Sequence, residues 1–241
     1  GFLFCSVGYG RAISDYMINR LPKWVEAGGF LLALNAGFIN AVGVLGLAHQ
    51  VVSHLTGVST FLSVEIVSAN TQDIIHLILV IISFMVGAAY SGLVIGNTAL
   101  KLGRSYSVAL LSESVLLLVS LLLLSNGMMA GHFFAAAACG LQNAMTTTYS
   151  GAVVRTTHVT GLFTDLGVAL GLRFRGQKID VRKFILYITL IAGFLIGGIV
   201  GALLFNRYHF SAMLVPCVLT ALVAVSYWLF LQYRDLRPRA P

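Results

Sequence analysis

Two short polar stretches carry residue types that could bind a ligand. The first is "SHLTGVSTFL" (53–62) and the second is "THVTGLFTDL" (157–166). Each has a histidine, two threonines and a glycine at the same spacing; the matched positions are His54/His158, Thr56/Thr160, Gly57/Gly161 and Thr60/Thr164. Imidazole and hydroxyl groups both donate and accept hydrogen bonds, so they suit a polar solute.

The surrounding chain is strongly apolar. Of its 241 residues, 58% are hydrophobic and only 10% are charged, which is too little polar surface for a protein surrounded by water. Runs such as 74–98 and 106–125 reach the roughly 20 residues that span a bilayer. We expect an all-α multi-pass protein in the lipid bilayer of a bacterial inner membrane, with no nucleic-acid partner despite its net charge of +7.

Eight apolar segments are predicted, two of them short. They cover 26–47, 54–69, 74–98, 106–125, 130–150, 158–172, 183–205 and 210–232. Residues 1–23 precede them as an N-terminal arm or interfacial helix. The three single cysteines, at positions 5, 139 and 217, lack the spacing of metal or disulfide sites, so we expect no metal and no cofactor.

The second half of the chain resembles the first. With an offset of 103 to 104 residues, "GFINA" (37–41) falls on "GLQNA" (140–144) and the two polar stretches coincide. This predicts repeat 1 over 24–126, repeat 2 over 127–234 and a tail over 235–241. Chance similarity between apolar helices explains matched glycines, but it explains matched His, Asn and Thr poorly because lipid disfavours them.

Positive charge favours one topology. If both short segments are re-entrant and the N-terminus is cytoplasmic, 14 of the 15 Lys and Arg residues lie inside; if all eight segments cross, 11 lie inside. The prediction is therefore about six spanning helices as two inverted three-helix repeats, each with a short polar re-entrant or broken helix. Both termini are then cytoplasmic.

Each polar stretch is typical of a helix start. Ser53 and Thr157 precede the repeated histidines and suit the N-cap position. In inverted repeats both starts point toward the midplane, where free amide groups favour a small polar or anionic solute. Alternatively, the threonines bond to carbonyls of their own helices.

Other polar residues extend the candidate site. Asn40, Gln142 and Asn143 could complete a substrate-binding lining, or could hydrogen-bond between helices. A carboxylate in the membrane is costly unless paired or protonated, so Asp165 and Glu113 are candidates for proton coupling. Alternatively, Asp165 forms a structural ion pair with Arg155.

These features favour a transporter or a channel-like protein whose site lies between the repeats. No enzyme signature is found, so we expect no catalytic residues. The alternatives are a structural or regulatory membrane protein, and an intramembrane hydrolase using a repeated histidine. Small-residue ladders at 87–96 and 193–201 would pack the two halves together or form a homodimer face.

The chain resembles the YoaK-like bacterial membrane proteins, which are often described as small-molecule transporters. The resemblance runs through 24–205 and depends on "LNAGFINAVGVLGL", "SHLTGVSTFL", "GLQNA" and "VVRTTHVTGLFTDLG". It implies about six spans and supplies no substrate. Asn40 stands where the family often has Asp, and Val58 where an Asn commonly follows the Thr-Gly pair.

Overall fold

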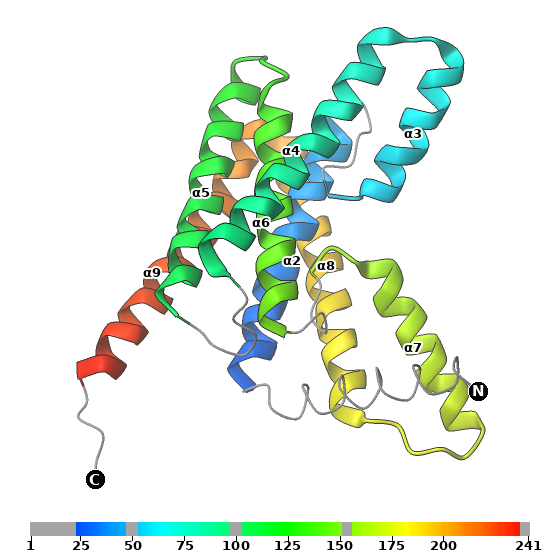
Figure 1. Cartoon of the computed structure of the whole chain (residues 1–241), viewed down its shortest axis with the longest axis vertical. Coiled ribbons are helices and arrows are strands. Elements are labelled where there is room, and N and C mark those ends of the chain that lie inside the picture. Colours follow the sequence, from blue (N-terminus) through cyan, green and yellow to red (C-terminus); the bar gives the residue numbers. More distant parts are fainter. Residues whose placement is uncertain (1–22, 47–52, 97–102, 151–155, 237–241) are drawn as a thin grey trace.

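The computed structural model describes residues 23–46, 53–96, 103–150 and 156–236, and these parts of the chain are mostly helical (Figure 1). The elements are α2 (Lys23–Gly46), α3 (Leu55–Ser68), α4 (Thr71–Ile95), α5 (Arg104–Ser125), α6 (Gly131–Ser150), α7 (Val159–Phe174), α8 (Val181–Tyr208), the 3₁₀ helix η1 (His209–Met213) and α9 (Leu214–Leu236). The predicted arm and most of the predicted tail lie outside the described residues.

The described helices are those of a membrane-embedded protein. By length and composition, four stretches can cross a membrane: Glu26–Gly46, Thr71–Ile95, Arg104–Ser125 and Val181–Arg234. The last runs through α8, η1 and α9 and so contains two helices of more than 20 residues each. Large apolar side chains face outward along these helices, as expected where lipid replaces water.

Local sequence explains where α7 ends and where α8 begins. Gly176 follows α7 with a positive φ of 76°, and the Gln177 amide donates to the carbonyl of Leu172. Glycine adopts this left-handed conformation without a steric penalty, which closes the helix. The carboxylate of Asp180 then accepts from two amides of the first turn of α8 and caps it.

Two close helix crossings hold the described structure together, between α2 and α8 and between α4 and α6. At each crossing a Cβ on either of two glycines would overlap a backbone carbonyl oxygen of the facing helix. The pairs are Gly37 with Phe194 and Gly197 with Leu34, then Gly140 with Phe84 and Gly87 with Ala137. The two crossings are equivalent. Residues 34 and 37 of α2 correspond to 137 and 140 of α6, and residues 194 and 197 of α8 correspond to 84 and 87 of α4. The predicted packing of the two halves by small residues is confirmed at these positions.

Helices α2 and α8 run in the same direction. The glycines of α8 at 193, 197 and 201 face residues 30, 34 and 38 of α2, so the residue numbers rise together. This four-residue spacing lets two helix backbones approach closely along one face. Gly92 and Gly96 of the other predicted ladder meet nothing within 4 Å.

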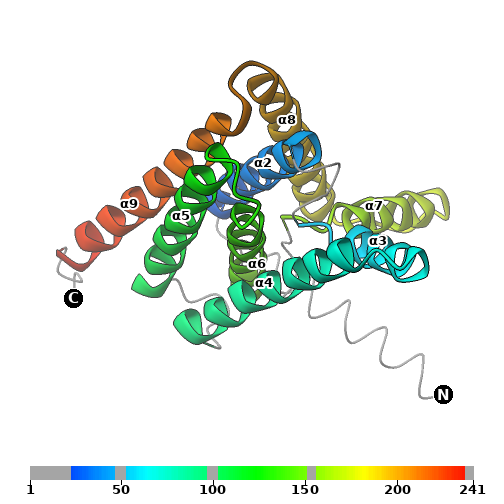
Figure 2. The same ribbon diagram turned by 90° about the horizontal axis from the view of Figure 1, so that it is seen from above.

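The short helices α3 and α7 lie on one side of the molecule, away from α5 and α9 (Figure 2). They point in opposite directions from starts near half the height of the molecule (Figure 1). Each buries one side chain, Val58 in α3 and Leu162 in α7. The fold therefore brings the beginnings of both polar stretches toward the middle of the structure.

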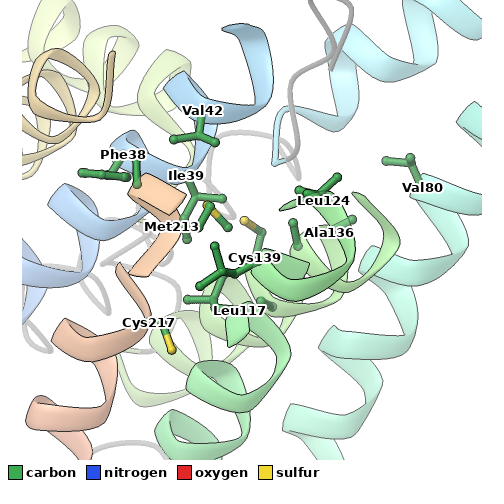
Figure 3. Packing of buried hydrophobic residues seen from close by; sticks show 14 of the residues in the cluster. Phe38, Ile39, Val42, Val80, Leu117, Leu124, Ala136, Cys139, Met213 and Cys217 are labelled. Carbon is green, nitrogen blue, oxygen red and sulfur yellow. The ribbon is translucent and has the colours of Figure 1, made fainter. Parts of the chain in front are cut away.

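A buried apolar cluster packs α2, α5, α6, η1 and α9 against one another. Ile39 of α2, Met213 of η1 and Cys139 of α6 converge in one buried cluster, with Leu117 of α5 beside them (Figure 3). Cys217 of α9 belongs to the same cluster, and both described cysteines are buried thiols. Both pack among apolar side chains.

Candidate functional site

A cavity of about 670 Å³ lies where the two polar stretches meet. It is lined by His54 before α3, by Thr157 before α7, by Thr160 and Phe163 of α7, and by Asn40 of α2. Small residues of α2 and α8, among them the crossing residue Gly37, make up much of the remaining wall. Both polar stretches, about a hundred residues apart in the sequence, therefore contribute to one cavity.

The predicted motif residues divide into two groups. His54, Thr160 and Asn40 line this cavity, whereas Thr56, Gly57, Thr60, His158, Gly161 and Thr164 are not among its lining residues. The hydroxyls of Thr60 and Thr164 donate to the carbonyls of Thr56 and Thr160, one turn earlier in their own helices. For these two threonines the alternative of bonding within the helix is confirmed.

The repeated glycine has a structural reason that the sequence did not reveal. A Cβ on Gly57 would lie 2.8 Å from Nδ1 of His54, and a Cβ on Gly161 would likewise overlap the ring of His158. The histidine ring therefore folds over the first turn of its own helix, and only glycine leaves room for it.

The predicted N-caps are wrong by one residue. The N-cap residues of α3 and α7 are His54 and His158, and neither makes a side-chain capping bond. Ser53 is used differently, because its hydroxyl accepts from Nδ2 of Asn40 at 2.6 Å and its amide donates to Oδ1 of Asn40 at 3.1 Å. The polar residue that could cap each helix instead ties the helix start to the preceding helix.

The second polar stretch is tied in a similar way. Thr157 donates to Oδ1 of Asn143 on α6 at 3.1 Å. Asn40 and Asn143, matched in the sequence, therefore anchor the matched residues Ser53 and Thr157. An aspartate at position 40 would still accept from both the amide and the hydroxyl of Ser53, so the anchor requires an acceptor at this position.

The remaining candidates in the described parts of the chain are not among the residues that line the cavity. Glu113 of α5 is fully buried, and Gln142 of α6 is buried close to it in one polar cluster. Asp165 is exposed on α7 and is not part of the cavity lining. Arg155 lies outside the described residues, and so does the predicted pair of Arg155 with Asp165.

Sequence reasoning missed two groups of polar residues. Asn35 of α2 joins Glu113 to Gln142 in the buried cluster; its only signal was an amide side chain in an apolar run. His76 of α4 and His132 of α6 approach to 2.8 Å between ring nitrogens, and one of these nitrogens donates to the other. Within the described parts of the chain, no group of three or more His, Cys, Asp or Glu could hold a metal ion.

Comparisons with known proteins place the chain in a family without assigning it an activity. A comparison with curated proteins found no match, and a comparison with solved structures found none either. The family model described as "Protein of unknown function (DUF1275)" matches residues 28–226, which include every residue that lines the cavity. The chain therefore belongs to the DUF1275 family.

Proposed function

We propose that this protein lets a small polar or anionic solute cross the membrane, and that the solute binds in the cavity between the starts of α3 and α7. The observation that carries this proposal is the shared cavity, to which His54 and Thr160 come from different halves of the chain. Polar side chains inside a membrane protein are costly unless they face a partner or a cavity. Packing alone does not require both polar stretches to lie in the same cavity.

The chemistry of the lining favours the proposed class of solute. Most of the wall is apolar, with Phe163 and Phe194 on it, and the polar groups gather at the two helix starts. Neither helix has a side-chain cap, so first-turn amides remain available to an acceptor. Amides and the positive end of a helix attract an anionic or strongly dipolar group.

The proposed topology is six spans in two inverted repeats, with α3 and α7 re-entrant. It is supported by the two equivalent helix crossings and by the opposite directions of α3 and α7. It is also consistent with the resemblance to the YoaK-like proteins. Positive charge favours an inner-membrane location with cytoplasmic termini.

A variant that fills the cavity tests the function. Gly198 of α8 lines the cavity, and a Cβ there would meet only the carbonyl oxygen of Gly37, at 3.7 Å. Gly198→Phe places a ring in the cavity with little disturbance of the crossing. Gly92→Phe is the matched control, because Gly92 is exposed on α4 and meets nothing within 4 Å.

The measurement is light scattering of protein-containing liposomes after mixing with urea, glycerol, formate or nitrate. We expect at least one probe to enter faster than into empty liposomes, Gly198→Phe to remove the difference and Gly92→Phe to keep it. Entry equal to that of empty liposomes for all four probes contradicts the proposal. Unchanged entry in Gly198→Phe contradicts the site.

A second candidate is a structural or regulatory membrane protein, and one observation favours it. The anchors from Asn40 to Ser53 and from Asn143 to Thr157 use polar residues of the motif for packing. Under this alternative no probe enters faster than into empty liposomes, so Gly198→Phe can change only the thermal stability.

A further inference from the structure

A buried polar cluster lies apart from the cavity, where α2, α5, α6 and α9 meet. At its centre Nδ2 of Asn35 lies 3.1 Å from Oε1 of Glu113, 3.3 Å from Oε1 of Gln142 and 3.0 Å from Oγ1 of Thr220. All four side chains are at most 2% exposed. Buried polar groups at such a position must satisfy one another, because neither lipid nor water reaches them.

The cluster has more acceptors than hydrogens. The amide of Asn35 has two hydrogens for three acceptors. Gln142 uses both of its hydrogens elsewhere, on the carbonyl of Leu32 and the hydroxyl of Thr156, and Thr220 donates to the carbonyl of Pro216. Two buried oxygens, Oε2 of Glu113 and Oδ1 of Asn35, have no partner. One further hydrogen on the carboxyl group would remove this deficit.

Among the described residues, no charged group lies where it would stabilise a carboxylate at Glu113. Within the described residues, its one hydrogen-bonding partner is the neutral amide of Asn35. The titratable neighbours on the packed helices are the Cys139 thiol of α6, which interacts with Glu113, and the Cys217 thiol of α9, which bonds to Ser114. Tyr90 of α4 bonds to Ser112, the residue before Glu113. A fully buried carboxylate without a cation is strongly disfavoured.

We propose that Glu113 is a proton-binding site and that Asn35, Gln142 and Thr156 link its protonation state to the start of α7. An ionised Glu113 accepts from Nδ2 of Asn35. A protonated Glu113 donates from Oε2 to Oδ1 of Asn35, while its Oε1 still accepts from Nδ2. Ionisation removes this hydrogen and strengthens the demand of the carboxylate for the hydrogens of Nδ2, because a charged acceptor forms the stronger bond. The carboxylate then competes with Gln142 for these hydrogens and weakens the bond from Asn35 to Gln142.

The link ends at the cavity. Gln142 holds the hydroxyl of Thr156 at 3.1 Å, and the next residue, Thr157, lines the cavity. A change in the orientation of Gln142 therefore acts on the anchored segment that precedes α7. The proton site stands on its own geometry; only the use of this link in solute binding rests on the proposed function.

Infrared spectroscopy of the full-length protein tests the proton site without any solute. A buried protonated carboxyl group has its own C=O stretching band, and this band should be lost in Glu113→Gln. The matched control is Glu65→Gln, because Glu65 is a half-exposed carboxyl group on α3 outside the cluster; this variant should keep the band. Absence of the band in the unsubstituted protein throughout a pH titration would overturn the proton site.

Thiol labelling tests the link. Phe163→Cys, in a background with Cys5 replaced by Ser, places a reactive group at the start of α7, while the other two cysteines are buried. Because a thiol reacts as its thiolate, the rate of modification by an impermeant thiol reagent is divided by the rate for free cysteine at the same pH. We expect this relative rate to change with pH in step with the infrared band. Glu113→Gln and Gln142→Leu should each remove this step, and Gln142→Leu should keep the band.

Two results would overturn the link. The first is a band that titrates while the labelling rate, relative to free cysteine at the same pH, shows no step, and the second is a band that never titrates. Neither readout uses transport, so a liposome experiment without permeation leaves this inference untouched.

Discussion

The glycines at the two helix crossings give a quantitative prediction. In Gly197→Ala the new Cβ overlaps the carbonyl oxygen of Leu34, a backbone atom that cannot rotate away, so α2 and α8 must separate. Overpacking costs about 1–3 kcal/mol, and a clash with backbone belongs at the upper end. Replacing Gly by Ala inside a helix gains about 1 kcal/mol. The expected net destabilisation is about 2 kcal/mol, and Gly87→Ala at the equivalent crossing against Ala137 should match it.

Thermal unfolding of the purified protein in detergent measures this effect. For a chain of this size about 2 kcal/mol corresponds to a fall in Tm of about 4–8 °C. The control is Gly198→Ala, one residue away on the same helix, where the Cβ meets one atom at 3.7 Å. It should leave Tm unchanged or raise it by a few degrees. If Gly197→Ala melts at or above the temperature of Gly198→Ala, the close crossing of α2 and α8 is refuted.

Three further predictions concern the anchors, a helix cap and the topology. Asn40→Ala removes both bonds to Ser53 and should cost about 1–3 kcal/mol, whereas Asn40→Asp keeps an acceptor and should cost less; the comparison of Tm values decides. Asp180→Ala removes the cap of α8 and should cost about 0.5–2 kcal/mol by the same measurement, while Asp180→Asn should retain most of the stability. Single cysteines at Gln72 and Lys101, probed in intact cells with an impermeant thiol reagent, should react at Gln72 alone if the repeats are inverted; the reverse pattern establishes eight crossings.

Helix positions could be predicted from the sequence because hydrophobic run length is a local property. The segment predicted at 106–125 is α5, and the short segment predicted at 54–69 is α3, with ends shifted by one or two residues. The match between the two polar stretches was equally visible, since equivalent positions in two repeats keep the same residue types. Both stretches do contribute to one cavity.

Side-chain partners could not be predicted, because they depend on which helices lie face to face. Ser53 is a good N-cap residue, yet the nearby amide of Asn40 bonds to it instead. Asn35 gave no signal beyond its type, and it acquires a role only when α5, α6 and α9 bring Glu113, Gln142 and Thr220 to it.

The apolar, helical character of the chain and the match between its halves can be recognised without a structure, because neither depends on how the helices pack. Helix packing, in contrast, brings both polar stretches to one cavity and the buried carboxyl group to a separate cluster. Close approach of backbones at glycine sets which helices cross, and the crossing sets which polar groups meet.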